Sequence, residues 1–238
     1  MKKLTLFLMI TVSFLGWSCK SSKILTATFE GDPVDGLPAK NLPGDPAGDA
    51  IVYHDAIHPR LKVQNSTIAG SKALNFIFNA ISNPAPPLSA QWLSFKGIGT
   101  DLTETLWFTH TGQNNGATVL IDVTDGHAHI IARMRISPNG TVGLAQNLQD
   151  DYTNEIGSVG SGVHTIVFTV TTSALKYNVT VFPAQGEALT AEDLPMITTN
   201  PLHFSNPAHP MLSFFHKEPT PPGGSYTIGS VTITRKKP

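Results

Sequence analysis

Hydrophobic and polar residues alternate with a period of two through residues 163–183. Every second residue of 166–170 is aliphatic or aromatic, and the same holds for 177–181 after a polar turn. This alternation is typical of two half-buried strands that pair as a hairpin. One face of the hairpin is apolar and the other is rich in threonine, so the apolar face requires a second layer to pack against.

Shorter runs with the same alternation occur along the rest of the chain, separated by segments rich in Gly, Pro, Asn and Asp. They predict further strands at 24–30, 50–53, 60–63, 73–79, 89–95, 104–111, 117–123, 127–136, 141–146, 211–216 and 225–235. One short helical fragment is expected at 190–194. There the side chain of Thr190 could cap the first turn, and Asp193, three residues later, could bond back to Thr190.

The last predicted strand, 225–235, changes parity in its middle. Its apolar residues occupy one parity up to Ile228 and the other parity from Val231 onwards. A β-bulge at Gly229 and Ser230 would keep both sets on the core side of the sheet.

About a dozen short strands with almost no helix predict an all-β fold, a two-sheet antiparallel sandwich. The composition shows no internal linker, so residues 24–235 are expected to form one domain, followed by a tail at 236–238. With 40% hydrophobic residues in 238, the chain can bury a sizeable core.

The N-terminus has the layout of an export signal. Two lysines precede a short apolar run at 4–15, and small residues stand three and one positions before Cys19. Residues 1–18 are therefore interpreted as a cleaved signal peptide, and 19–23 as a short polar tether. The apolar run is too short for a permanent transmembrane helix, which needs about 20 residues.

This leader resembles that of bacterial lipoproteins, in which lipid is attached to the cysteine that becomes the mature N-terminus. The resemblance implies an exported protein that Cys19 anchors in the cell envelope, with the outer membrane as the expected location. The alternative is an ordinary secreted protein with a free N-terminal thiol. Because Cys19 is the only cysteine, no intramolecular disulfide can form.

The charge balance excludes some partners. The chain has 16 basic and 17 acidic residues, and loss of the leader removes two lysines, which leaves 14 basic residues. A balance so close to neutral provides no electrostatic footprint for nucleic acid or for an anionic membrane surface.

Four stretches together suggest a family. They are F-E-G-D at 29–32, K-A-L-N-F-I-F at 72–78, G-V-H-T-I-V-F-T-V at 162–170 and S-Y-T-I-G-S-V-T-I at 225–233. Their order resembles the concanavalin A-like lectin and laminin-G-like jelly roll. The resemblance implies two curved antiparallel sheets in which the first and last strands are neighbours.

The same resemblance raises the question of a structural calcium ion. Family members with calcium often carry acidic residues in the first loop and in the final strand. Glu30, Asp32 and Asp35 could serve the first part, whereas Gly229 and Ser230 stand where the closing acidic pair would be.

Many enzymes on this fold cleave polysaccharides. Retaining glycosidases need two carboxylates about 5 Å apart. The nearest stretch, 120–125, contains Asp122 and Asp125, which differ in strand parity and have no Glu beside them. The sequence also lacks a nucleophile elbow, a phosphate loop and a dinucleotide fingerprint, so a glycosidase and these other enzyme classes are disfavoured.

Arg133 and Arg135 share one parity of a predicted strand. Together with Trp107, His110 or His216 they could bind an acidic sugar, or act in a lyase that neutralises a uronate and moves a proton. The alternative is a pair of arginines that covers a solvated sheet face with aliphatic stems.

Two histidine pairs have spacings that metal sites use. His127 and His129 stand two apart on a predicted strand. His54 and His58 have the spacing of a zincin helix, but Pro59 follows at once and prevents a helix there. Both pairs are interpreted as turn or surface features.

Aromatic residues are the remaining indication of function. Trp92 and Trp107 lie in predicted strands and Tyr152 lies near a polar loop, and such rings stack well on sugar C–H faces. The sequence therefore favours a lipid-anchored, non-catalytic protein of the cell envelope that binds glycan or another envelope ligand. Two alternatives stay open, namely a polysaccharide lyase and a structural or accessory protein that contacts an envelope protein.

Overall fold

The computed structural model describes residues 21–42, 49–53, 61–78, 92–98, 105–127, 129–147, 152–198, 202, 209–216 and 224–236. All the regular elements in these residues are β-strands, arranged in two antiparallel sheets. The described part of the chain holds no helix of the length and apolar character that a membrane crossing requires.

The first sheet contains eight strands: β1 (Ser21–Ala27), β3 (Leu61–Asn65), β4 (Lys72–Phe78), β6 (Thr105–Asn115), β11 (Val163–Thr171), β12 (Lys176–Phe182), β13 (Leu189–Pro195) and β15 (Gly224–Lys236). Their order is β13-β12-β11-β6-β15-β4-β3. β4 pairs with the first half of β15 and β1 with its second half, so the first and last strands are neighbours, as the family resemblance implies.

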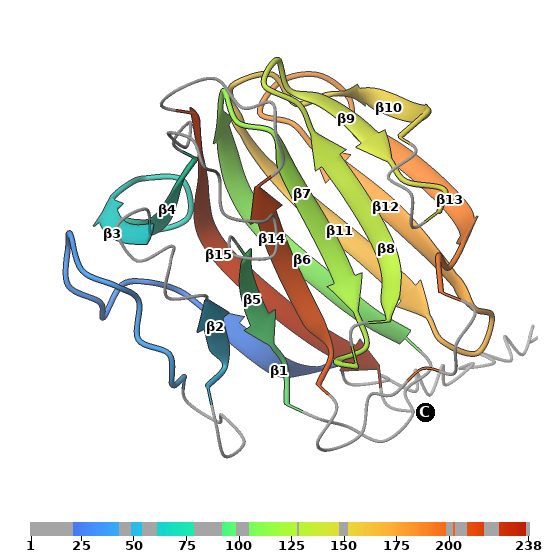
Figure 1. The fold of residues 1–238 in the computed structure, drawn as a ribbon, viewed down its shortest axis with the longest axis horizontal. Coiled ribbons are helices and arrows are strands. Elements are labelled where there is room, and N and C mark those ends of the chain that lie inside the picture. The colour runs from blue at the N-terminus through green and yellow to red at the C-terminus, as the bar shows by residue number, and fades with distance from the viewer. Residues whose placement is uncertain are drawn as a thin grey trace, which may run out of the picture.

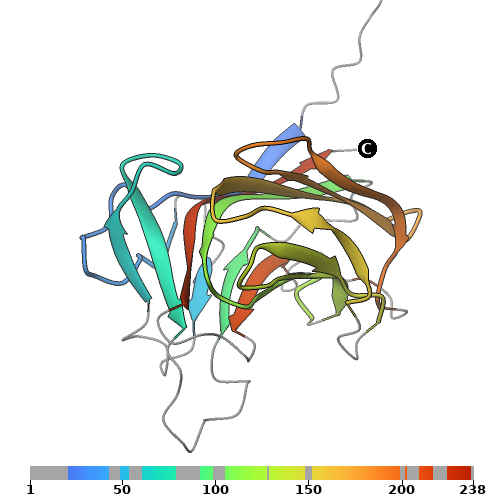
Figure 2. The same cartoon turned by 90° about the horizontal axis from the view of Figure 1, so that it is seen from above.

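The second sheet contains seven strands: β2 (Ile51–Tyr53), β5 (Trp92–Lys96), β7 (Val119–Thr124), β8 (Ile130–Ile136), β9 (Thr141–Leu144), β10 (Asn154–Ser158) and β14 (Met211–His216). Their order is β10-β9-β8-β7-β14-β5-β2. Figure 1 shows this sheet in front of the first, and Figure 2 shows the strands as two stacked layers. The predicted two-sheet antiparallel sandwich is confirmed.

The hairpin predicted at 163–183 is confirmed as β11 and β12. Ile166 lies opposite Val181 and Phe168 opposite Val179, and all four side chains are fully buried. The threonine-rich face of the hairpin is half-exposed. The sequence alternation therefore reports which face of these strands packs against the second sheet.

The predicted bulge in the last strand is also confirmed. The pairing between β15 and β6 shifts register between Ile228 and Ser230. As a result, Ile228 and Val231 are both fully buried although they stand three residues apart. The extra residue in the strand keeps the apolar side chains of its two halves on the same side of the sheet.

Residues 190–194 are not helical, so that expectation is wrong. They belong to β13, which pairs with β12 through a register shift opposite Asn178. Asp193 has a left-handed φ of 55°, and its N–H donates to Asn178 Oδ1 at 2.8 Å. The capping pattern at Thr190 therefore marks an irregular edge strand, because pairing along β12 stabilises these residues more than one helical turn would.

The start of β1 and the presence of β10 also differ from expectation. β1 begins at Ser21 and pairs Ser21 with Lys236, so part of the expected tether (19–23) and the first residue of the expected tail (236–238) lie in the first sheet. β10 forms at Asn154–Ser158, where no strand is predicted. This strand contains one glycine and one serine, and its apolar and polar residues alternate only weakly, so the sequence does not indicate it.

One continuous apolar core fills the space between the sheets. Large rings from the second sheet meet there, for example Phe95 and Phe214 in an edge-to-face contact with ring centroids 5.9 Å apart. Side chains of the opposite parity therefore lie on the outer faces of the sandwich, where any site for a large ligand must be sought.

Candidate functional site on the outer face of the second sheet

The structure separates the aromatic and the basic residues that the sequence analysis groups together. Trp107 lies on β6 between the core residues Leu106 and Phe108, so it faces outward from the first sheet. Arg133 and Arg135 lie on β8 and face outward from the second sheet, because their neighbours point into the core. The two faces are on opposite sides of the sandwich, so these residues line no common site.

Of the two histidines predicted to join this set, only His110 has a side chain that the structure describes. His110 is fully buried between the sheets. The backbone of His216 pairs with Val119 at the end of β14, and its side chain lies outside the described residues. Cys19, His54 and His58 also lie outside the described residues.

Side chains on the outer face of the second sheet form two parallel rows. Strand pairing places Arg133, Asp122, Ser213 and Ser94 in one row, across β8, β7, β14 and β5. It places Arg135, Leu120, Phe215 and Trp92 in the next row across the same strands. A mostly polar row thus runs beside a row that is apolar apart from one arginine.

The polar row is held by short hydrogen bonds. Arg133 donates from Nε and Nη2 to the two carboxylate oxygens of Asp122 at 2.8 and 2.7 Å. Asp122 is 1% exposed, and the paired arginine satisfies its charge. Further along the row, the hydroxyls of Ser94 and Ser213 lie 2.6 Å apart.

Arg135, in the apolar row, has a different environment. Its guanidinium lies over the ring of Tyr152, 4.7 Å from the ring centroid. Gly143 is the cross-strand partner of Arg135, and a Cβ there would come within 3.3 Å of Tyr152. A glycine at this position therefore leaves room for the tyrosine beneath the arginine.

The rest of this row joins a small apolar cluster. Leu120 and Tyr152 are buried there with Ala145, and the half-buried Ile197 and Phe215 pack against them. Trp92, the cross-strand neighbour of Phe215, is also half-buried. Sequence analysis did not select Ser213 and Phe215, although their shared parity within 211–216 could have indicated a second functional face.

Asp125 organises the turn that carries the first histidine pair. It is fully buried, its Oδ1 accepts the N–H groups of His127 and His129, and its Oδ2 lies 2.8 Å from His129 Nδ1. β8 starts only at Ile130, so neither histidine lies on a strand. The pair is a turn feature, as interpreted.

Two of the three acidic residues considered for calcium accept hydrogen bonds from the protein. Glu30 Oε1 accepts the N–H groups of Ser71 and Lys72 at 2.7 and 3.1 Å, and Oε2 accepts from Ser71 Oγ. These bonds lower the pKa of Glu30. Asp32 Oδ1 accepts the N–H of Ala39. Within the described residues no three acidic, histidine or cysteine side chains form a possible metal-binding group.

His110 instead belongs to a buried polar network in the core. Its Nε2 lies 2.9 Å from Tyr226 Oη, and His164 Nε2 lies 2.7 Å from the same oxygen. His164 Nδ1 donates to the carbonyl of Gly162, which can only accept. Therefore Tyr226 donates to His164, and His110 donates to Tyr226.

Burial keeps this network uncharged. It lowers the pKa of His164 to about 4 and, together with the nearby His164, the pKa of His110 well below its ordinary value. It also raises the pKa of Tyr226. These hydrogen bonds link β6, β11 and β15 inside the core. None of these bonds involves a side chain on the outer face of the second sheet.

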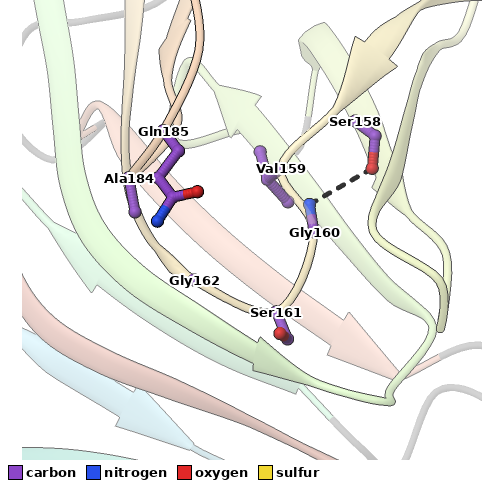
Figure 3. A pocket seen from close by; sticks show the side chains of 7 residues that line it. All are labelled: Ser158, Val159, Gly160, Ser161, Gly162, Ala184 and Gln185. Atoms are coloured by element: carbon purple, nitrogen blue, oxygen red, sulfur yellow. Dashed lines mark hydrogen bonds between the residues drawn. The ribbon is translucent and has the colours of Figure 1, made fainter.

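A pocket of about 480 Å³ opens where β10 leads into β11 (Figure 3). Residues 158–162 line one side, and Ala184 and Gln185, which follow β12, line the other. Gly160 donates its N–H to Ser158 Oγ and has a left-handed φ of 60°. These lining residues are uncharged, so they offer hydrogen bonds but no ionic contact.

A second hollow of about 300 Å³ lies at the side of the sandwich, between β9 and β12. Leu144 and Asn154 line it from the second sheet, and Tyr177 and Leu194 from the first. Burial raises the pKa of Tyr177 to about 12, so its hydroxyl stays protonated at neutral pH. We assign no ligand to this hollow.

No protein-family model and no curated protein matches the sequence. Many solved structures have similar folds, among them a lectin-like protein, a lectin and a carbohydrate esterase. Arcelin-5, a lectin-like defense protein from Phaseolus vulgaris, is 9% identical with a TM-score of 0.50, over 92% of this chain and 99% of that one. Peanut lectin in complex with a peptide is 9% identical with a TM-score of 0.51, over 90% and 97%.

The third similar structure is a carbohydrate esterase of the Shiga toxin-encoding bacteriophage phi24B. It is 13% identical with a TM-score of 0.53, over 92% of this chain and 100% of that one. Identities this low establish the fold alone. The chain therefore has the two-sheet antiparallel jelly-roll fold of the legume lectins, as the concanavalin A-like resemblance predicts.

Proposed function

We propose that this protein binds carbohydrate without catalysing a reaction, and that it does so on the outer face of the second sheet. The observation that carries the proposal is the pair of side-chain rows on β5, β14, β7 and β8. Half-buried Trp92 and Phe215 offer apolar ring surface to sugar C–H groups. In the neighbouring row Ser94, Ser213 and Asp122 are buried, so the partly exposed Arg133 is the member that can donate to a sugar hydroxyl.

The size of this face suits an extended ligand. Neighbouring strands lie about 4.8 Å apart, so the three gaps between Arg135 and Trp92 span about 14 Å. An oligosaccharide fits this length better than a single sugar. The fold supports the proposal by analogy, because arcelin-5 and peanut lectin are described as a lectin-like protein and a lectin.

The same geometry argues against the enzymes considered from the sequence. Asp122 and Glu155 are the described carboxylates on this face, and three strand gaps, about 14 Å, separate their strands. Glycosidases need carboxyl groups within about 10 Å of each other. The lyase considered from the sequence uses both arginines together with a histidine, whereas Arg133 is bound to both oxygens of Asp122 and His110 is buried in the core.

We further propose that the protein is exported and held in the cell envelope, in the outer membrane, by lipid on Cys19. The leader supports this, because the lone cysteine directly follows an apolar segment and a small-residue cleavage site. A carbohydrate-binding domain at this location would meet polysaccharides or envelope proteins.

A glycan array tests the binding proposal. The full chain, purified in detergent, is expected to bind a subset of oligosaccharides, and Trp92→Ala is expected to weaken that binding at least tenfold. Trp107→Ala is the matched control, because Trp107 faces outward from the other sheet. Binding that Trp107→Ala abolishes and Trp92→Ala leaves intact would contradict the proposed site.

Product analysis of each bound oligosaccharide tests the absence of catalysis. We expect no new reducing ends and no unsaturated uronates after prolonged incubation. Unsaturated uronates would identify a lyase, and new reducing ends without them would identify a hydrolase.

A further inference from the structure

Arg135 differs from the other arginines that the structure describes. Arg133 is bound to Asp122 through two hydrogen bonds, and Arg235 donates from Nε to Ser22 Oγ. Arg135 Nε is buried and has no hydrogen-bond partner. Within the described part of the chain, the guanidinium of Arg135 makes one polar or ring contact, with the face of Tyr152.

This arrangement is costly in the absence of a ligand. A guanidinium is always charged at physiological pH, and a buried N–H without a partner loses its hydrogen bonds to water. The ring of Tyr152 orients the guanidinium plane but neutralises no charge. Native proteins satisfy most buried donors, so an exception beside a candidate site indicates a missing acceptor.

We propose that the carbohydrate bound on this face is acidic, and that Arg135 pairs with its carboxylate. The inference rests on the proposed function and adds the chemical class of the ligand. The planar fork of a guanidinium matches the two oxygens of a carboxylate. Arg133 is already paired in this way with Asp122, so of the two arginines on this face Arg135 is the one available to a ligand carboxylate.

The neighbouring residues define the rest of the ligand. Leu120 and Phe215 follow Arg135 in the same row, and Trp92 ends it. The ligand therefore combines a carboxylate at one end with sugar rings that stack about 14 Å away, across three strand gaps. Oligosaccharides that contain a uronic or sialic acid have this combination.

The test uses carboxylated oligosaccharides, namely oligogalacturonates and sialylated oligosaccharides, each printed beside its own methyl ester. Esterification removes the charge and keeps the sugar backbone. The full chain is expected to bind at least one acid at least tenfold more tightly than its ester. Arg135→Gln is expected to remove this preference, whereas Lys62→Gln, an equal charge change on an exposed residue of β3, is expected to preserve it.

One further variant, and the acid–ester comparison on the unaltered chain, separate an effect on binding from an effect on folding. Arg135→Lys keeps the charge without the fork, so it is expected to retain only part of the preference for the acid. The comparison of acid and ester on the unaltered chain needs no variant at all.

Equal binding of acids and esters, or an Arg135→Gln variant with full preference for the acid, would overturn the inference. If neutral glycans bind and only Trp92→Ala weakens them, the acidic ligand is refuted and the proposed function stands. If nothing on the array binds, both are refuted.

Discussion

Arg133 on β8 and Asp122 on β7 face each other across the second sheet, with two hydrogen bonds of 2.8 and 2.7 Å between them. The side chain of Asp122 is 1% exposed and that of Arg133 15% exposed. The carboxylate is thus withdrawn from water, and its charge is balanced by one arginine in a bidentate geometry. This pair fixes the polar row on which the candidate site depends.

Breaking this pair is expected to destabilise the protein strongly. Arg133→Met leaves Asp122 buried without its main counter-ion, so the free energy of unfolding should fall by about 3–5 kcal/mol. Urea denaturation followed by fluorescence measures the change. Arg135→Gln is the control on the same strand and should change stability by less than about 1 kcal/mol, since among the described residues Arg135 contacts the ring of Tyr152 and no carboxylate. Equal losses from both substitutions would contradict this account of the row.

Acidification is expected to destabilise the fold through the buried histidines. Burial lowers the pKa of His164 from 6.5 to about 4 and lowers that of His110 as well. The unfolded chain therefore binds more protons than the folded chain below pH 6.5. Stability should be complete above pH 6.5 and fall as the pH drops to about 4, by roughly 3 kcal/mol from His164 alone.

Urea denaturation at several pH values between 7.5 and 4 measures this effect. His164→Gln should reduce the slope of stability against pH, whatever its effect on stability at pH 7.5. His127→Gln is the control, because His127 is exposed. A slope that His164→Gln leaves unchanged would show that other groups govern the acid response.

Gly112 is expected to be intolerant of substitution because of Tyr226. A Cβ on Gly112 would lie 2.6 Å from Tyr226 Oη and 2.9 Å from its Cζ. Gly112→Ala should lower the free energy of unfolding by about 1–3 kcal/mol through overpacking. Gly31→Ala is the control, since a Cβ there meets no atom within 4 Å.

A double-mutant cycle tests the cause of this loss. Tyr226→Phe removes the hydroxyl that a Cβ on Gly112 would strike, so Gly112→Ala should cost less in that background. Strict additivity of the two substitutions in urea denaturation would exclude the proposed steric contact.

Lipid attachment at Cys19 is tested by metabolic labelling with an alkyne fatty acid. The full chain should incorporate the label and fractionate with membranes. Cys19→Ser should lose both properties, because the acylated thiol is the proposed anchor. Unlabelled protein that is released as a soluble product would instead support ordinary secretion.

Local alternation was sufficient to predict the parts of the fold where each strand has one buried face. The β11–β12 hairpin and the bulge after Ile228 follow from the parity of apolar residues, because a strand sends alternate side chains to opposite faces. At residues 190–194 the local capping pattern favoured a helix, yet pairing with β12 determined the structure. A pattern one turn long carries little weight against a ladder of hydrogen bonds.

The composition of the candidate site could not be obtained in the same way. Parity predicted that Arg133 and Arg135 face outward together, but it could not show that Asp122 satisfies one of them and Tyr152 stacks under the other. It also could not show that Trp107 lies on the opposite side of the sandwich, since which strands share a sheet depends on long-range pairing.

The sequence by itself determined most of the strands, their buried faces and the expectation of two antiparallel layers, because these depend on side-chain periodicity within a few residues. Tertiary structure decided which outward side chains become neighbours, because β5, β7, β8 and β14 come together from distant parts of the chain. The parity of 104–111 already places His110 with Leu106 and Phe108, and the tertiary structure decided what it meets in the core, the ring of Phe214 of the second sheet, with ring centroids 5.1 Å apart.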